Sequence, residues 1–156
     1  MKANIGIAKA HLQPLATMLN TLLADEYVLY TKTRNYHWNV TASNFMELHK
    51  LFEGQYEELD TVVDDIAERS RALGHNSLGS LKQFLAITRL TEDDKATNAK
   101  QMLQNLLNDH ETIIRILRND IQVAADKYKD AGTSDFFTGL LKQHEKTAWF
   151  IRSYLA

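Results

Sequence analysis

The sequence FMELHKLFEGQYEELDTVVDDIAERSRAL, residues 45–73, carries its apolar side chains three or four residues apart, which is the period of an amphipathic helix. The apolar set is Phe45, Leu48, Phe52, Leu59, Val63 and Ile66. N-cap candidates precede it at Thr41-Ala-Ser-Asn44, Glu47 follows Asn44 by three residues, and Gly74 stands after its end. We therefore predict one long helix over residues 45–73 with one buried face.

The same period flanks this segment on both sides. From Leu12 to Asn35 it predicts a first long helix that begins near Pro14, which leaves residues 1–11 as a short N-terminal tail. After the central helix, the stretch from His75 to Leu90 contains Gly79 and one short apolar piece. It is too long for a hairpin turn, so we expect a crossover connection with a short helix of its own.

Two further long helices are predicted in the second half of the chain. Thr91-Glu-Asp-Asp is expected to open the third, which reaches about Tyr128. Thr133 or Ser134, before Asp135, is expected to cap the fourth, which ends near Leu155. Four long helices with an extended connection between the second and the third are typical of a ferritin-like four-helix bundle.

Composition agrees with this all-α architecture. The 156 residues include one Pro and six Gly, strand-like alternation is missing, and a 44% hydrophobic chain of this length suits one domain over residues 1–156. With no Cys, any metal chemistry falls to His and carboxylates, which suit iron, manganese or zinc. The formal net charge of -2 gives no overall attraction for nucleic acid. No signal peptide or membrane span is predicted, so we expect a soluble intracellular protein.

A polar stripe borders the apolar face of the central helix. His49, Glu53, Asp60, Asp64 and Glu68 all fall within an arc of about 100° around the helix axis. His49 with Glu53, and Asp64 with Glu68, are four residues apart, so each pair can reach one ion. Taken alone, either pair is more commonly a patch of solvated surface.

The distance along the helix changes this interpretation. Eleven residues from Glu53 to Asp64 span about 16 Å, which is too far for one metal site in one chain. A second copy packed antiparallel across a two-fold axis would bring His49 and Glu53 beside the other chain's Asp64 and Glu68, giving two equivalent sites. A site inside one bundle is disfavoured because no Glu-x-x-His motif is present. The residues three before His37, His49, His75, His110 and His144 are Arg34, Met46, Ala72, Leu107 and Leu141.

Several motifs resemble the Dps family, and the resemblance covers nearly the whole chain. They are Asn35-Tyr-His-Trp-Asn-Val40, Phe45-Met-Glu-Leu-His49-Lys-Leu-Phe-Glu53, Asp64-Asp-Ile-Ala-Glu68-Arg69, Leu73-Gly74, Thr133-Ser-Asp135 and His144-Glu-Lys-Thr-Ala-Trp149-Phe. The resemblance implies a ferroxidase that oxidises Fe(II), preferably with hydrogen peroxide, and stores ferric mineral inside a hollow homododecamer. It also implies dinuclear iron sites at two-fold interfaces, where zinc or manganese can substitute, and a place in the bacterial cytoplasm or nucleoid.

Carried over by position, the resemblance implies five metal ligands: His37, His49, Glu53, Asp64 and Glu68. Glu68 would be the strongest ligand and the bridge between two irons. Many relatives carry Asp where this chain has Glu53, whose longer arm should still bind metal but shifts the weaker second position. Without the resemblance, His37 is as well explained as a helix-end residue bonded to the backbone.

Other positions carry both a functional and a structural explanation. Trp38 resembles an aromatic that accepts oxidising equivalents beside the iron site, although an interfacial or core role is more common for Trp. Asp126, Asp130 and Asp135 lie where relatives line three-fold pores, although Asp135 also suits a helix cap. Asp60 and Asp65 are better explained as surface. The remaining candidates are assigned to packing and surface: His110, Glu111, His144 and Glu145.

DNA binding is expected to be weak or absent at physiological salt. Lys2 and Lys9 are the only lysines before the first helix, with His11 as a third charge below neutral pH. Two alternatives to an iron-storing ferroxidase remain open. One is a nucleoid-associated, DNA-protecting protein with structural metal sites, and the other is a helical interaction module that binds no metal.

Overall fold

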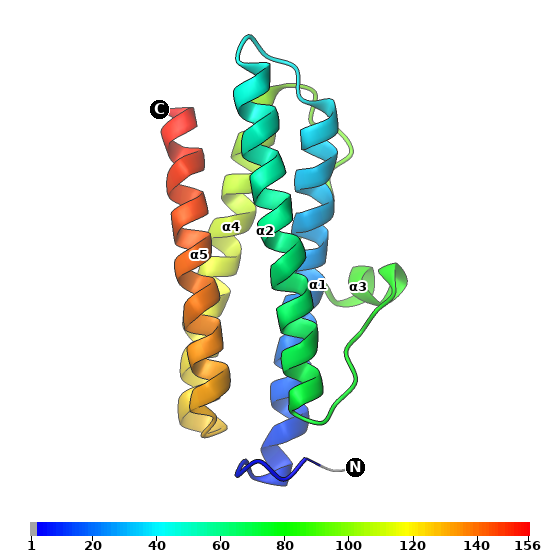
Figure 1. Cartoon of the computed structure of the whole chain (residues 1–156), viewed down its shortest axis with the longest axis vertical. Helices are drawn as coiled ribbons and strands as arrows, with labels where there is room; N and C mark the ends of the chain where they lie inside the picture. The colour runs from blue at the N-terminus through cyan, green and yellow to red at the C-terminus, as the bar shows by residue number, and fades with distance from the viewer. Residues whose placement is uncertain (1–2) are drawn as a thin grey trace.

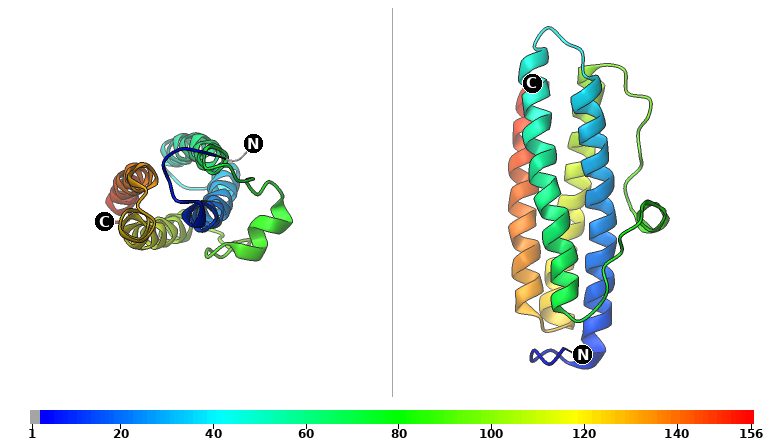
Figure 2. Two further views of the ribbon diagram at one scale, coloured as in Figure 1. Left: turned by 90° about the horizontal axis from the view of Figure 1, so that it is seen from below. Right: turned by 45° about the vertical axis from the view of Figure 1, so that its right-hand side comes forward.

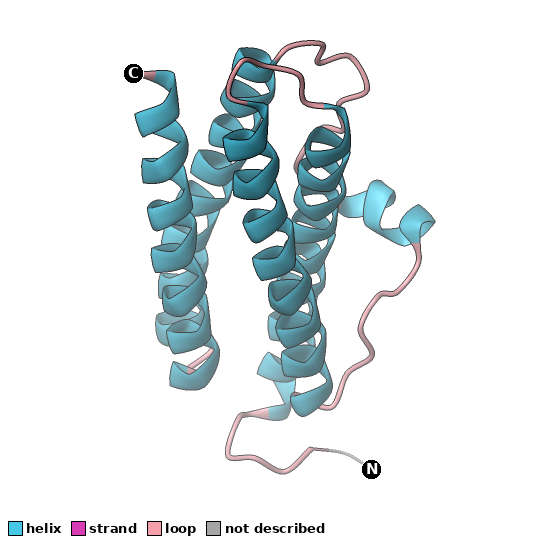
Figure 3. Cartoon of the chain, turned by 45° about the horizontal axis from the view of Figure 1, so that its top comes forward, coloured by secondary structure: helices cyan, strands magenta, loops and turns pink. Residues whose placement is uncertain are grey.

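The computed structural model describes residues 3–156 and contains four long helices (Figure 1). They are α1 (Lys9–Asn39), α2 (Phe45–Ala72), α4 (Ala99–Gln122) and α5 (Ala131–Leu155). A short helix, α3 (Leu81–Ile87), lies in the connection between α2 and α4, and a π-helical turn, η1 (Val123–Lys127), extends α4. Among the described residues no strand is present (Figure 3). The predicted all-α, ferritin-like bundle with a short helix in its crossover is confirmed.

Two antiparallel hairpins, α1 with α2 and α4 with α5, make up the bundle. The crossover runs the length of the molecule on the outer side of α1, so α2 and α4 point in the same direction (Figures 1 and 2). α3 is held there by Phe84, which is buried and stacks on Tyr27 with ring centroids 4.6 Å apart. Ser80 and Gln83 form a capping box that fixes its first turn.

The core is one continuous apolar cluster along the bundle axis. On α2 the buried side chains include Leu48, Phe52, Leu59 and Ile66, the face predicted from the spacing. The predicted limits of this helix are met within one residue. Leu73 closes α2, and Gly74 follows with φ of +85°, a left-handed conformation that glycine adopts without strain.

The first helix begins about a turn before its predicted start at Pro14. α1 starts at Lys9, so the extended tail ends at Ala8 rather than at residue 11. Its first turn is anchored by tertiary contacts, since Leu12 is buried and His11 Nδ1 lies 2.9 Å from the Tyr128 carbonyl oxygen. These contacts hold the turn in place although Pro14 cannot donate a backbone hydrogen bond.

The predicted starts of the third and fourth long helices were wrong. α4 begins at Ala99 rather than at Thr91, capped by Asn98, whose side chain accepts a hydrogen bond from Gln101 N at 2.9 Å. α5 begins at Ala131, with Asp130 rather than Thr133 or Ser134 as its cap. The cap of α4 lies later in the sequence than expected and the cap of α5 lies earlier. In both helices the capping side chain accepts hydrogen bonds from the free backbone N–H groups of the first turn.

Candidate metal centre

His37 and His49 meet at the tip of the α1–α2 hairpin. His37 lies in the last turn of α1 and His49 in the second turn of α2, and the bend between the helices brings their rings into a stack with centroids 3.8 Å apart. The His37 Nδ1 lies 2.9 Å from the His49 carbonyl oxygen, and the His49 Nδ1 lies 2.9 Å from the His37 carbonyl oxygen. The pair is therefore cross-linked reciprocally.

These two hydrogen bonds fix the tautomer of each ring. A carbonyl oxygen only accepts, so both Nδ1 atoms must donate a proton. In the neutral rings the lone pair then lies on Nε2, the atom available to a metal ion. Tyr56 packs edge-on against the His37 ring, with centroids 5.2 Å apart, which further restricts its orientation. Backbone anchoring of the far nitrogen is the usual way that proteins orient metal-binding His.

Glu53 lies one turn after His49 on α2 and forms an ion pair with Lys50. The hydrogen bond from Lys50 is the main cause that lowers the pKa of Glu53, and the nearby His37 and His49 lower it further. Glu53 is therefore ionised at neutral pH. The Lys50 side chain is 63% exposed, so this ammonium can leave when a stronger cation approaches.

Asp64 and Glu68 lie on the solvent side of the other half of α2. Both are exposed, and within residues 3–156 neither carboxylate forms an ion pair or a side-chain hydrogen bond. They are one helical turn apart, so the two carboxylates face the same region of solvent. Arg69, the nearest cation in the sequence, is occupied by Asp130, with 3.2 Å from Nη2 to Oδ2.

The structure thus holds the candidate ligands as two separated groups. His37, His49 and Glu53 lie at one end of α2, and Asp64 and Glu68 lie further along it. Across the part of the chain that the structure describes, no three His, Asp or Glu side chains converge closely enough to hold a metal ion. Completion of the site by a second copy stays a prediction.

Comparison with known proteins places this helical arrangement in a family. A model of the ferritin-like domain matches residues 16–156. The chain is 35% identical to the DNA protection during starvation protein 2 of Bacillus anthracis, over 88% of this chain and 94% of that protein. The chain belongs to the Dps family of ferritin-like proteins. It is also 42% identical to an uncharacterized low temperature-induced protein of Nostoc, over 99% of this chain and 87% of that one.

Solved structures agree with the Dps assignment. The Dps protein of Vibrio cholerae O1 superposes with a TM-score of 0.93 at 30% identity, covering 100% of this chain and 98% of that chain. It is described as a member of a broad superfamily of ferritin-like diiron-carboxylate proteins. No helix in residues 3–156 of this Dps chain has the length and apolar character to cross a membrane.

Trp38 of this Dps chain is not a core residue of the protomer. Its side chain is 65% exposed, next in sequence to His37, and the Arg34 guanidinium lies 5.4 Å from its ring centroid. Asp60 and Asp65, on the same helix as the carboxylate pair, are exposed as expected for surface residues. A redox role for Trp38 stays a prediction.

The three aspartates expected at a pore differ in their environments. Asp126 and Asp135 are exposed, whereas Asp130 is buried and accepts hydrogen bonds from Gly132 N and Thr133 N at the start of α5. Burial raises the pKa of Asp130, but hydrogen bonds from Thr133 and Gly132 and the charge of Arg69 outweigh it and hold this pKa below its usual value. Asp130 is thus the α5 cap, the role that sequence offered to Asp135.

The lysines near the N-terminus and the histidines of the core lie in different environments. Lys9 is exposed in the first turn of α1, and Lys2 lies outside the described residues. His110 and His144 are buried as expected for packing, but they also form a hydrogen-bonded chain with Glu26 that sequence analysis missed. The sequence signal for this chain was that each of these polar residues interrupts an otherwise apolar helix face.

Proposed function

We propose that this Dps chain forms a shell whose two-fold interfaces oxidise Fe(II) and whose interior stores the ferric product. The observation that carries the proposal is the locked His37–His49 pair, whose free Nε2 atoms face no partner among the described residues. An uncompensated carboxylate pair begins at Asp64, about 22 Å further along α2 than His49. Each group is half of a His and carboxylate ligand set that suits Fe(II). Zinc or manganese fits the same donors.

Surface complementarity supports an antiparallel pairing of two copies. Around the histidine pair the protomer exposes large apolar side chains, with Trp38 at 65%, Met46 at 61% and Phe45 at 40% exposure. Beside Asp64 there is an open hollow with an apolar wall. That wall includes Leu23, Tyr27, Val63, Leu78 and Phe84. A two-fold axis across α2 would seat the exposed tip of one copy in the hollow of the other and bring the two half-sites together.

The residues of the site have distinct proposed roles. The Nε2 atoms of His37 and His49 and the Glu53 carboxylate bind Fe(II) from one chain. Asp64 and Glu68 bind it from the other, and Glu68 bridges two ions. Fe(II) and hydrogen peroxide are the substrates: two ferrous ions lose one electron each and become ferric. One hydrogen peroxide takes up both electrons and two protons from solvent, and its O–O bond breaks to give two water molecules. Trp38 lies next to the site, where it can give up an electron to a stray oxidant.

Assembly into a homododecamer is part of the proposal, because a hollow shell is what separates the ferric product from the surroundings. Asp126 and Asp135, both exposed near the start of α5, are the proposed iron-entry residues, since carboxylates at a narrow pore concentrate cations. DNA binding is proposed to be weak or absent. A DNA-protecting role with structural metal sites would instead need several basic residues near the N-terminus, and residues 3–11 contain one lysine, Lys9, in the first turn of α1.

Rapid mixing of anaerobic Fe(II) with hydrogen peroxide tests the activity, with ferric absorbance as the readout. We expect wild type to catalyse the oxidation and Glu68→Ala to lower the oxidation rate roughly 100-fold. Loss of a residue that only supports a metal ligand already costs roughly 10- to 100-fold in activity, so loss of a ligand itself should reach the upper end of that range. Asp65→Ala, an exposed neighbour on the same helix, is the matched control and should retain the wild-type rate. Absence of catalysed oxidation by wild type would refute the proposed function.

A further inference from the structure

A layer of polar side chains crosses the middle of the bundle core. Each of the four long helices contributes one buried polar residue at a position where its neighbours on the same face are apolar. They are Glu26 on α1, Gln55 on α2, His110 on α4 and His144 on α5, with exposures of 0%, 6%, 2% and 2%. Polar groups placed in a core require hydrogen-bond partners, so this layer needs an explanation beyond packing.

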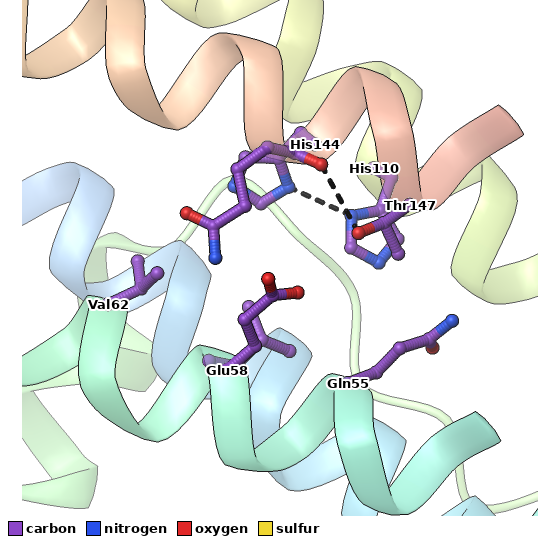
Figure 4. Close-up of a pocket in the computed structure, with 8 residues that line it drawn as sticks. Gln55, Glu58, Val62, His110, His144 and Thr147 are labelled. Atoms are coloured by element: carbon purple, nitrogen blue, oxygen red, sulfur yellow. Dashed lines mark hydrogen bonds between the residues drawn. The ribbon is translucent and has the colours of Figure 1, made fainter. Parts of the chain in front are cut away.

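Three members of the layer form a chain of hydrogen bonds. His144 Nε2 lies 2.9 Å from Glu26 Oε1. On its other side, His144 Nδ1 lies 2.8 Å from His110 Nδ1, a contact drawn in Figure 4. With the Glu26 carboxylate as the acceptor, His144 donates from Nε2, so its Nδ1 carries the lone pair. His110 must then donate from its Nδ1. The His110 lone pair therefore lies on Nε2.

That Nε2 atom has no partner within the described chain, although it is buried. Both amide atoms of Gln55 are likewise buried and without a partner. The His110 and Gln55 side chains line one small cavity between α2 and the α4–α5 hairpin, with a volume of about 10 Å³. In Figure 4 the second ring nitrogen of His110 points toward α2, and the Glu58 carboxylate points toward the histidines.

We propose that this cavity binds one divalent transition-metal ion such as Zn²⁺, held by His110 Nε2, the Glu58 carboxylate and the Gln55 amide oxygen. Imidazole and carboxylate oxygen are donors that Zn²⁺ and Fe²⁺ accept, and the amide oxygen and water can complete the coordination. Glu26 and His144 orient the His110 ring. In many metal sites a carboxylate accepts a hydrogen bond directly from the metal-binding imidazole, and here the His144 ring lies between the carboxylate and that imidazole.

This site is separate from the proposed inter-subunit site. Gln55 is two residues after Glu53, so the two side chains leave α2 about 160° apart, one into the bundle and the other away from it. A single chain supplies all three ligands of the in-bundle site. Its occupancy therefore does not depend on a two-fold partner or on the proposed ferroxidase function.

Cobalt binding tests the in-bundle site in a background that removes the other one. In the His49→Ala, Glu53→Gln, Asp64→Asn, Glu68→Gln quadruple variant, which removes ligands from both halves of the inter-subunit site, equilibrium dialysis with Co²⁺ should still find one ion per chain, with visible d–d absorption that Zn²⁺ abolishes. Adding Glu58→Gln should weaken this binding at least tenfold, because it removes the charged ligand without disturbing the core. Glu57→Gln, also exposed and adjacent in sequence, is the control and should not change it.

The histidine itself is tested by NMR, which does not require a core substitution. We expect the ¹⁵N shifts of His110 in the metal-free background variant to report a proton on Nδ1 and none on Nε2, and Zn²⁺ to shift Nε2 selectively. No Co²⁺ retained in the background variant would overturn the proposal. Binding unaffected by Glu58→Gln, or a His110 Nε2 resonance unaffected by Zn²⁺, would do the same and leave water as the occupant.

Discussion

Two inactive variants, His49→Ala and Glu68→Ala, should restore each other's activity when coexpressed in one cell. In a homodimer of either variant both sites are damaged, because every site takes one half from each chain. In a mixed dimer one site receives both damaged halves. The other receives the intact His49 of one chain and the intact Glu68 of its partner, and so is complete.

The size of the recovery follows from this pairing. With equal amounts of the two chains and random association, roughly half of the dimers are mixed, and one of the two sites in each mixed dimer is whole. We therefore expect roughly a quarter of the wild-type sites, and about a quarter of the wild-type rate. The prediction depends on the separation of about 16 Å between the two groups, which prevents one chain from using its own acids.

Stopped-flow oxidation of Fe(II) by hydrogen peroxide measures the recovery, and size-exclusion chromatography verifies that the mixed shells assemble. His49→Ala mixed with His37→Ala is the matched control. Both changes damage the same half, so no mixed dimer has a whole site and the rate should stay at the level of either variant alone. Recovery in the control, or none in the test mixture, would refute a site divided between chains.

Three further outcomes follow from the protomer. Asp130→Ala should lower the free energy of unfolding by about 2 kcal/mol in chemical denaturation, because α5 loses its cap, whereas Asp135→Ala should change it by less than about 0.5 kcal/mol. Because the folded pKa of Asp130 is depressed, this difference should be complete above pH ~4, the ordinary Asp value, and shrink as pH falls further. Gly74→Ala should cost about 1 kcal/mol or more in the same assay, since φ is +85° and the new Cβ would lie 3.0 Å from Ala3 Cβ. In gel shifts at neutral pH and physiological salt, DNA should remain unbound, and tight salt-resistant complexes would contradict this.

Sequence predicted the helices best where local signals were sufficient. The limits of α2 agree with the local signals: Asn44 occupies the N-cap position, although its side chain forms no capping hydrogen bond, and Gly74 with its positive φ follows the last turn. Asn98 caps the start of α4, and the loop before it is held by Asp93, whose side chain accepts hydrogen bonds from Lys95 N, Asn105 and Tyr36. Tyr36 is 57 residues away from Asp93 in sequence, so this contact could not be predicted from a local pattern, although Asn98 was itself a local cap signal.

The candidate metal centre was predicted in its components but not in its geometry. Helical spacing separated Glu53 from Asp64, and that separation holds in the structure. The reciprocal hydrogen bonds between His37 and His49 could not be predicted, because they depend on the bend through residues 40–44. The polar core layer was missed for a similar reason: its four residues come from four different helices, and only the packing of those helices brings them together.

Dividing the proposed site between two chains also links metal binding to assembly. Glu53 has Lys50 as a counter-ion in the protomer, but Asp64 and Glu68 are like charges one turn apart, and neither forms an ion pair with any residue from 3 to 156. A metal ion shared with the partner's histidines would remove this repulsion only in the paired state. An ion that binds the dimer and not the separate chains must stabilise the dimer by mass action. Zn²⁺ should therefore strengthen the two-fold interface of wild type and leave that of Glu68→Ala nearly unchanged.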